Sequence, residues 1–202
     1  LRNLAFRVRA LADSPRQAGL RELWRRHVDL EATRPLLLVF PEDSWAEVIP
    51  ARTLAIHDPF WRQWEWYLRH LLWRGAHLDD DFVFEPDLPV AAVVRRGGWG
   101  LEARYRRLDA KGSYVWDAPL KDERDLERLT VPRAEVDRAA TRRAVEALSA
   151  AIGDILPVQT CCPVPAANLI GEAAMLRGLE QVMLDMHDEP ALLHRLMAFL
   201  AR

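Results

Sequence analysis

Two glutamates follow apolar runs that predict buried strands. Glu42 comes shortly after PLLLVF at residues 35–40, and Glu85 ends the short run FVFE at 82–85. At the carboxyl end of a strand, such carboxylates can bind a cationic or hydroxylated substrate, or act as general acid and base where partial burial raises their pKa. The sequence leaves open the alternative that both are ordinary loop carboxylates in contact with water.

A tryptophan in the same region has a different setting from most of the others. Trp61, Trp64 and Trp73 fall within one amphipathic segment, where core packing is the expected role. Trp45 instead follows the first apolar run, in the loop that contains Glu42. We therefore expect Trp45 to stack against a substrate.

Asn168 and the pair Cys161-Cys162 follow the third apolar run of the chain. Asn168 stands at the start of a predicted helix, where it either caps that helix or points into a pocket. Adjacent cysteines point to opposite faces of a strand, so they are poorly placed to bind one metal ion. We expect both to be small, buried, reduced side chains that are not paired with each other, and we keep Cys161 as a candidate for substrate binding.

No residue pattern predicts a metal site. The histidines show neither an i, i+4 pair nor a neighbouring acidic cluster with metal-ligand spacing: His27, His57, His70, His77, His187 and His194. Two cysteines in the whole chain are too few for a disulfide framework, which favours a reducing compartment, so we expect the cytoplasm.

Composition narrows the range of partners. The chain has 202 residues, of which 50% are hydrophobic, and can bury a sizeable core. Its net charge of -2 and its pI near 6.3 argue against binding to nucleic acid or to an anionic membrane surface. No apolar run approaches the roughly 20 residues of a membrane-spanning helix. We expect a small-molecule substrate, and the oligomeric state stays open.

The elements that would position these residues alternate along the chain. Apolar spacing predicts helices at 16–30, 58–74 and 134–152, and strands at 35–40, 82–85 and 155–160. An antiparallel excursion is expected at 89–94 and 113–116. Two helices follow the last strand: one has Leu176, Leu179, Val182, Met183 and Met186 on one face, and the last comes after Asp188-Glu189-Pro190. Strands that alternate with helices predict an α/β fold. About three such units fit half of a (β/α)8 barrel, because a whole barrel takes about 250 residues.

Several segments together resemble the uroporphyrinogen decarboxylase superfamily. They are RPLLLVFPEDSWAEVIP, DPFWRQWEWYLRHLL, DDDFVFEP, WDAPLKDERDLERLTVP and LIGEAAMLRGLEQVMLDMHDEPALLHRLMAFL, which span residues 16–202 in order. The superfamily comprises decarboxylases and corrinoid-dependent methyltransferases. The resemblance implies that residues 1–202 are the N-terminal portion of a (β/α)8 TIM barrel, and that the barrel continues beyond Arg202.

The departures from the decarboxylase pattern decide between the two activities. The decarboxylases have an arginine-bearing RQAGR motif after their first strand, whereas RQAG stands here at 16–19, before that strand. After the first strand this chain has Pro41-Glu42-Asp43, whose carboxylates would repel a polyanionic substrate. Phe84-Glu85-Pro86 occupies the region where the decarboxylases have a Phe-Ser-Asp motif with a key aspartate, and the position of their tyrosine falls on Leu169. Decarboxylation of uroporphyrinogen is therefore not expected.

The resemblance then implies methyl transfer that involves a corrinoid protein. The methyltransferases of the superfamily use zinc held by a His-x-Cys pair and a later cysteine, and this set would lie outside the present chain. One alternative is a decarboxylase that acts on another carboxylated substrate. A second alternative is a barrel without catalytic activity that serves as a binding or assembly subunit.

Overall fold

The computed structural model describes residues 1–107, 114–162 and 168–202. The chain divides into two compact units. The first consists of Leu1–Ala92 with Arg138–Cys162, and the second of Val93–Asp137 with Pro163–Arg202. Both contain helices and small sheets, so the fold is mixed α/β, and no closed barrel is present among the described residues.

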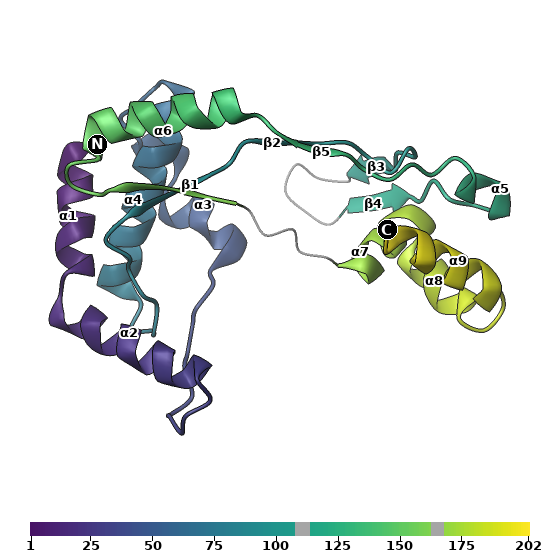
Figure 1. Ribbon diagram of the computed structural model, residues 1–202, viewed down its shortest axis with the longest axis horizontal. Coiled ribbons are helices and arrows are strands. Elements are labelled where there is room, and N and C mark those ends of the chain that lie inside the picture. Colours follow the sequence, from purple (N-terminus) through teal and green to yellow (C-terminus); the bar gives the residue numbers. More distant parts are fainter. Residues whose placement is uncertain (108–113, 163–167) are drawn as a thin grey trace. The chain divides into compact units, whose positions relative to one another are not determined.

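The first unit is a parallel strand pair with helices packed around it (Figure 1). Its elements are α1 (Arg2–Ala12), α2 (Pro15–Val28), the 3-10 turn η1 (Glu42–Ser44), α3 (Trp45–Val48), the 3-10 turn η2 (Ala51–Thr53), α4 (Pro59–His77), β1 (Leu88–Ala91), α6 (Arg138–Ile152) and β6 (Val158–Cys161). In the pair, Leu88 lies opposite Val158 and Ala91 lies opposite Cys161. Helix α6 precedes β6 in the chain and packs against both strands.

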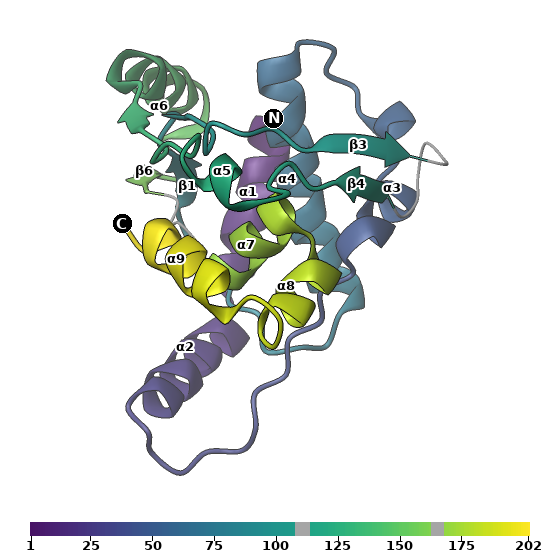
Figure 2. The same cartoon turned by 90° about the vertical axis from the view of Figure 1, so that its right-hand side faces the viewer.

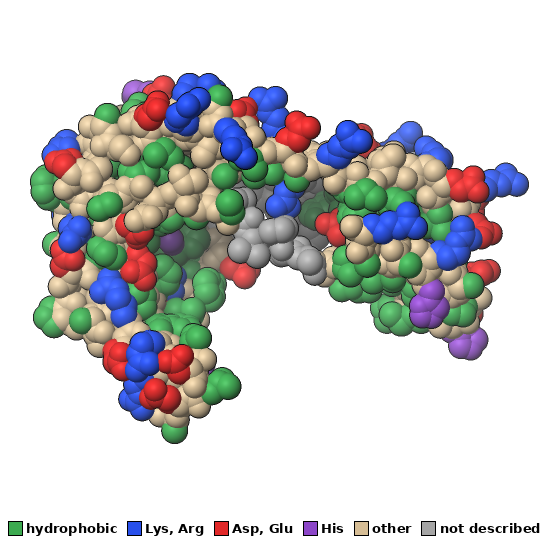
Figure 3. Space-filling view, in the orientation of Figure 1, with side chains coloured by type: hydrophobic (Ala, Val, Ile, Leu, Met, Phe, Trp, Pro, Cys, Tyr) green, Lys and Arg blue, Asp and Glu red, His purple; other side chains and the backbone are tan. Residues whose placement is uncertain are grey.

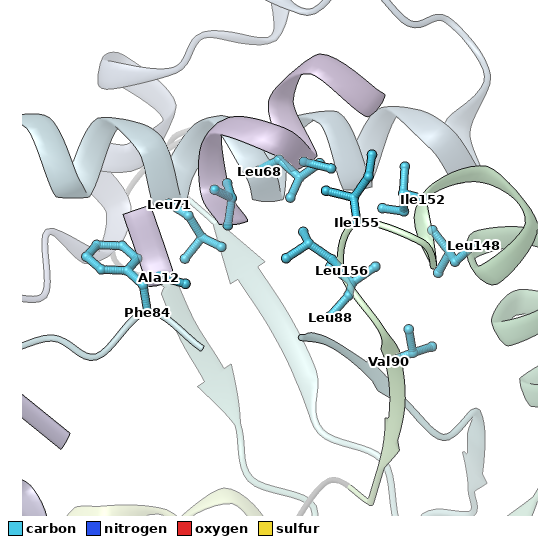
Figure 4. Close-up of a cluster of buried hydrophobic side chains, with 12 residues drawn as sticks. Ala12, Leu68, Leu71, Phe84, Leu88, Val90, Leu148, Ile152, Ile155 and Leu156 are labelled. Atoms are coloured by element: carbon cyan, nitrogen blue, oxygen red, sulfur yellow. The ribbon is translucent and has the colours of Figure 1, made fainter. Parts of the chain in front are cut away.

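Helices α1, α4 and α6 supply most of the core of this unit. Leu68 and Leu71 come from α4, and Leu148 and Ile152 come from α6 (Figure 4). Leu68, Leu148 and Ile152 are 0% exposed, so these side chains are completely removed from water. Full burial of a leucine or isoleucine side chain stabilises the fold by about 1.5–3 kcal/mol relative to exposure.

Helix α4 forms as its sequence predicts. The side chain of Asp58 accepts a hydrogen bond from the Trp61 N–H at 3.1 Å, and Pro59 occupies the first turn. Such a cap satisfies one of the free N–H groups at a helix start, and proline at the first position has none to satisfy. The helix continues to His77, three residues beyond the predicted end at Arg74.

The predicted strand at 35–40 is wrong. These residues run without strand pairing, and Leu37 and Phe40 are 61% and 66% exposed. Carboxylates take the place of a neighbouring strand: Asp81 Oδ2 accepts the Leu37 N–H at 2.8 Å, and Asp80 Oδ2 accepts the Val39 N–H at 3.0 Å. Side chains thus satisfy backbone donors that a sheet would otherwise bond.

The predicted strand at 82–85 is also wrong, for the same physical reason. Gln17 donates to the Phe82 carbonyl at 3.4 Å and accepts the Phe84 N–H at 2.8 Å. Arg21 donates to the Phe84 carbonyl at 2.6 Å. Side chains of α2 therefore bond the backbone of this segment, so no partner strand is needed.

Acid should weaken this arrangement through Asp81. Hydrogen bonds from Arg34 and from the Leu37 N–H lower the pKa of Asp81 from 3.8 to about 2. A depressed folded-state pKa gives stability that is fully present above the unfolded pKa and is lost as the pH falls through the folded pKa. We expect the free energy of unfolding to fall by about 1–2 kcal/mol between pH 4 and pH 2. The loss is no larger because water screens the charge of the half-exposed Arg34. Urea unfolding at several pH values measures this change in the free energy of unfolding. An Asp81→Asn variant whose stability falls as steeply with pH as that of the wild type would contradict the role of Asp81.

The second unit holds two antiparallel strand pairs and a helical cluster (Figure 2). Its elements are β2 (Val94–Arg96), β3 (Arg104–Arg107), β4 (Tyr114–Asp117), α5 (Glu123–Leu126), β5 (Ala134–Val136), α7 (Leu169–Arg177), α8 (Leu179–Asp185) and α9 (Pro190–Leu200). Strand β2 pairs with β5, and β3 pairs with β4. The expected excursion is thus antiparallel, but 114–117 pairs with 104–107 and not with 89–94. The helix predicted at 134–152 begins only at Arg138, because 134–136 forms β5.

Gly178 divides what the sequence predicts as one helix. Its φ of 94° is left-handed, a conformation that glycine adopts without strain, so α7 ends there and α8 begins. Val182 is buried, whereas Met183 and Met186 are 63% and 60% exposed, so the predicted apolar face is only partly covered. The last helix, α9, follows Pro190 as predicted.

Candidate functional site

A pocket of about 550 Å³ lies in the first unit, between α2 and the extended segments at 35–40 and 82–85. Its walls combine apolar and charged side chains: Arg21, Trp24, Arg25, Val28, Asp29, Leu38, Phe82, Val83 and Glu85. A volume of this size is typical of sites for small molecules. Both apolar runs of the sequence contribute to the site, although neither forms a strand.

Helix α2 presents one side of the pocket. Arg21, Trp24, Arg25 and Val28 recur at helical spacing, so they share a face of α2. The indole Nε1 of Trp24 donates to the Asp81 carbonyl at 2.7 Å, which fixes the ring against the extended segment. The pocket therefore has an aromatic wall whose orientation is set by a hydrogen bond.

The charges in the pocket are paired with one another. Arg21 Nε lies 3.4 Å from Glu85 Oε2, and Arg21 also donates to the Phe84 carbonyl at 2.6 Å. Arg25 donates to Asp29 at 2.6 Å and to Glu22 at 2.8 Å, and its hydrogen bond lowers the pKa of Glu22. Figure 3 shows basic and acidic side chains side by side in the region of α2. Neither a cation nor a polyanion would find an uncompensated opposite charge here.

The two glutamates predicted from the sequence lie in different surroundings. Glu85 lines the pocket, next to Arg21. Glu42 is exposed in η1 with a φ of 48°, and it is not among the residues that line this pocket. Glu85 therefore shares this pocket with the aromatic ring of Trp24 and the guanidinium of Arg21.

Trp45 packs inside an aromatic cluster. Its ring meets His70 edge-on at 4.2 Å and Trp73 edge-on at 5.4 Å, measured between ring centroids. Both contacts are with residues of α4, and the role of Trp45 in substrate stacking stays a prediction. Asn168 Oδ1 accepts the Gly171 N–H at 3.0 Å, which confirms the capping alternative for that residue.

The prediction that the two cysteines are buried is wrong. Cys161 and Cys162 are both exposed, and both are free thiols in this structure. Among the described residues β6 has only β1 as a sheet neighbour, so its carboxyl end is left open to water. Burial raises the pKa of the nearby Tyr67, and the charges of Asp87 and Cys161 add to that effect.

Exposure of both thiols predicts rapid modification. Native protein treated with a thiol-reactive disulfide reagent should release two equivalents of its chromophore without denaturant, because neither sulfur is shielded. Cys161→Ser and Cys162→Ser should each release one equivalent. Thiols that titrate only after denaturation would show that this strand end is covered, and none even then would show that the two are paired.

No local sequence pattern singles out Arg21 or Trp24 as pocket residues. The helical spacing of Arg21, Trp24 and Val28 was visible, but Trp24 reads as part of the buried side of α2. Among the described residues, no group of three or more His, Cys, Asp or Glu side chains could hold a metal ion, so a zinc ligand set does not fit this part of the chain. No helix in the described ranges is long and apolar enough to cross a membrane.

Comparison with known proteins does not assign the chain to a family. No family model, no curated protein and no solved structure matches the chain. The structural observation that bears on function is therefore the pocket beside Glu85.

Proposed function

We propose that the protein is an enzyme of the uroporphyrinogen decarboxylase-like superfamily that transfers a methyl group from a small, uncharged, hydroxylated substrate. A corrinoid protein is the proposed partner, and the cytoplasm is the proposed compartment. The chain is proposed to be the N-terminal portion of a (β/α)8 barrel. The sequence resemblance over residues 16–202 supports the reaction class, and the pocket supports the class of substrate.

The observation that carries the substrate class is the pairing of Arg21 with Glu85 beside Trp24. A cationic substrate would have to compete with Arg21 for the Glu85 carboxylate. A polyanionic substrate would meet Glu85 and Asp29 among the lining residues. An uncharged ring that bears a hydroxyl group meets neither conflict, because it can stack on the indole and donate one hydrogen bond to Glu85.

The residues of this chain then bind and orient the substrate. Trp24, Val28 and Phe82 provide apolar contact that removes the ring from water. Glu85 accepts the hydroxyl proton in a hydrogen bond, and Arg21 holds that carboxylate in place. The corrinoid carried by the partner protein would supply the acceptor for the methyl group.

The test uses 2-methoxyphenol, which combines an aromatic ring, a hydroxyl group and a transferable methyl group. Full-length protein is incubated anaerobically with this compound and reduced cobalamin, and methylated cobalamin is followed by its absorbance and catechol by chromatography. In parallel, 4-hydroxybenzoate is supplied and released carbon dioxide is trapped. Formation of methylated cobalamin and catechol supports the proposal. Carbon dioxide release alone favours the decarboxylase alternative, and the absence of both reactions favours a non-catalytic subunit.

A further inference from the structure

A second cavity, of about 380 Å³, lies in the second unit, far along the chain from the residues of the first pocket. Its lining is mostly polar: Gly100, Leu101, Glu102, Arg104, Asp117, Pro119, Lys121 and Arg128. Three cations and two carboxylates are among these residues, so the lining carries a net positive charge. The volume is at the lower end of the roughly 300–1,000 Å³ range of ligand sites.

The backbone around this cavity is closely fitted. Gly100 has a φ of 87°, and a Cβ at this position would lie 2.7 Å from the Arg128 carbonyl oxygen and 2.8 Å from Thr130 Oγ1. The Thr130 N–H donates to the Trp99 carbonyl at 2.8 Å, which joins the two segments. Only glycine fits this close approach to the Arg128 backbone, and residues of the 100–104 segment line the same cavity as Arg128.

The three cations differ in how far they are already compensated. Lys121 pairs with Asp117, and Arg128 pairs with Asp125 at 2.8 Å. Arg104 lies opposite Asp117 in the β3–β4 ladder, yet within the described ranges its guanidinium makes neither a hydrogen bond nor an ion pair. The pKa of Asp117 is lowered, first by its bond to Lys121 and also by the charge of Arg104. Arg104 therefore offers a complete set of donors at the edge of the cavity.

We propose that this cavity binds a small anion that carries phosphate groups, with Arg104 as its principal ligand and with Lys121 and Arg128 as supporting charges. The planar guanidinium matches two oxygens of a phosphate group, which is why arginine is the usual residue at such sites. Because the lining is mostly polar, the site is suited to the charged part of a ligand and not to an aromatic ring. The inference is independent of the methyl-transfer proposal, since no residue is shared between the two pockets.

The test is calorimetric titration of the whole chain with inorganic pyrophosphate at constant ionic strength. Arg104→Gln should weaken binding by at least about tenfold, since charge-assisted hydrogen bonds are lost. Arg106→Gln is the matched control: Arg106 stands two residues further along β3, on the same face of the hairpin, exposed and outside the cavity. The affinity of the Arg106→Gln variant for pyrophosphate should stay within about twofold of the wild-type value.

Two results would overturn the inference. One is the absence of measurable pyrophosphate binding by the wild-type chain, and the other is an equal loss in Arg104→Gln and Arg106→Gln, which would indicate unspecific attraction to a basic surface. Lys121→Gln provides a second variant that should weaken binding. A thermal melt of each variant shows whether the second unit remains folded, and binding of 2-methoxyphenol should be unchanged in all three variants.

Discussion

Replacing Asp80 with alanine should lower the free energy of unfolding of the first unit by about 3–5 kcal/mol, because it leaves the Arg74 charge buried without a partner. The side chains of Asp80 and Arg74 are each 3% exposed, and Asp80 accepts a hydrogen bond from the guanidinium. Asp80 also accepts the Val39 N–H at 3.0 Å. The variant therefore removes the counter-ion of Arg74 and one of the bonds that hold the 35–40 segment.

Urea unfolding followed by tryptophan fluorescence measures this effect. Six of the eight tryptophans lie in Leu1–Ala92, so the signal reports mainly on the first unit. The matched control is Asp79→Ala, because the side chain of Asp79 is 95% exposed and pairs with Arg16 at the surface. Such an exposed pair contributes about 0–1 kcal/mol.

A second substitution separates the buried charge from the lost hydrogen bonds. Arg74 stacks on the ring of Phe82, with 4.2 Å from its guanidinium carbon to the ring centroid, so an apolar side chain at this position keeps contact with that ring. Arg74→Met in the Asp80→Ala background should recover part of the lost stability, because no unpaired charge is left inside. If Asp80→Ala costs no more than Asp79→Ala, this buried pair does not hold the unit together.

The helices of the chain were predictable because their signals are local. Asp58, Pro59 and the apolar stripe that includes Leu68 lie within a few turns of one another, so the cap, the start and the buried face of α4 can all be read from sequence. The strands at 35–40 and 82–85 could not be judged in the same way. An apolar run indicates burial, but it does not say what will bond the backbone, and here carboxylates and Gln17 provide those bonds.

The candidate site was predictable only in part, for a related reason. Glu85 could be selected because it ends an apolar run, and it does line the pocket. Arg21 and Trp24 belong to α2, which lies far earlier in the chain than Glu85. Arg21 contacts Phe84, which is 63 residues further along the chain, and Trp24 contacts Asp81. Such contacts depend on how α2 packs against the 81–85 segment, and no local pattern records that packing.

Replacing Glu85 with glutamine should lower kcat/KM for 2-methoxyphenol by about 10–150-fold, which corresponds to the loss of a charge-assisted hydrogen bond of about 1.5–3 kcal/mol. Glutamine keeps the shape of the side chain but removes the charge that accepts the hydroxyl proton and pairs with Arg21. The methyl-transfer assay measures the change. Methoxybenzene has no hydroxyl group, so its slower turnover should be nearly the same in the variant and the wild type.

Glu42→Gln provides the comparison that decides between the two glutamates. Glu42 is exposed and is not among the residues lining the pocket, so this variant should keep kcat/KM within about twofold of the wild-type value. A large loss of kcat/KM in Glu42→Gln, with little change in Glu85→Gln, would indicate that the substrate does not bind beside α2. Equal sensitivity of 2-methoxyphenol and methoxybenzene to Glu85→Gln would contradict a hydrogen bond from the substrate hydroxyl, because only one of the two compounds can donate it.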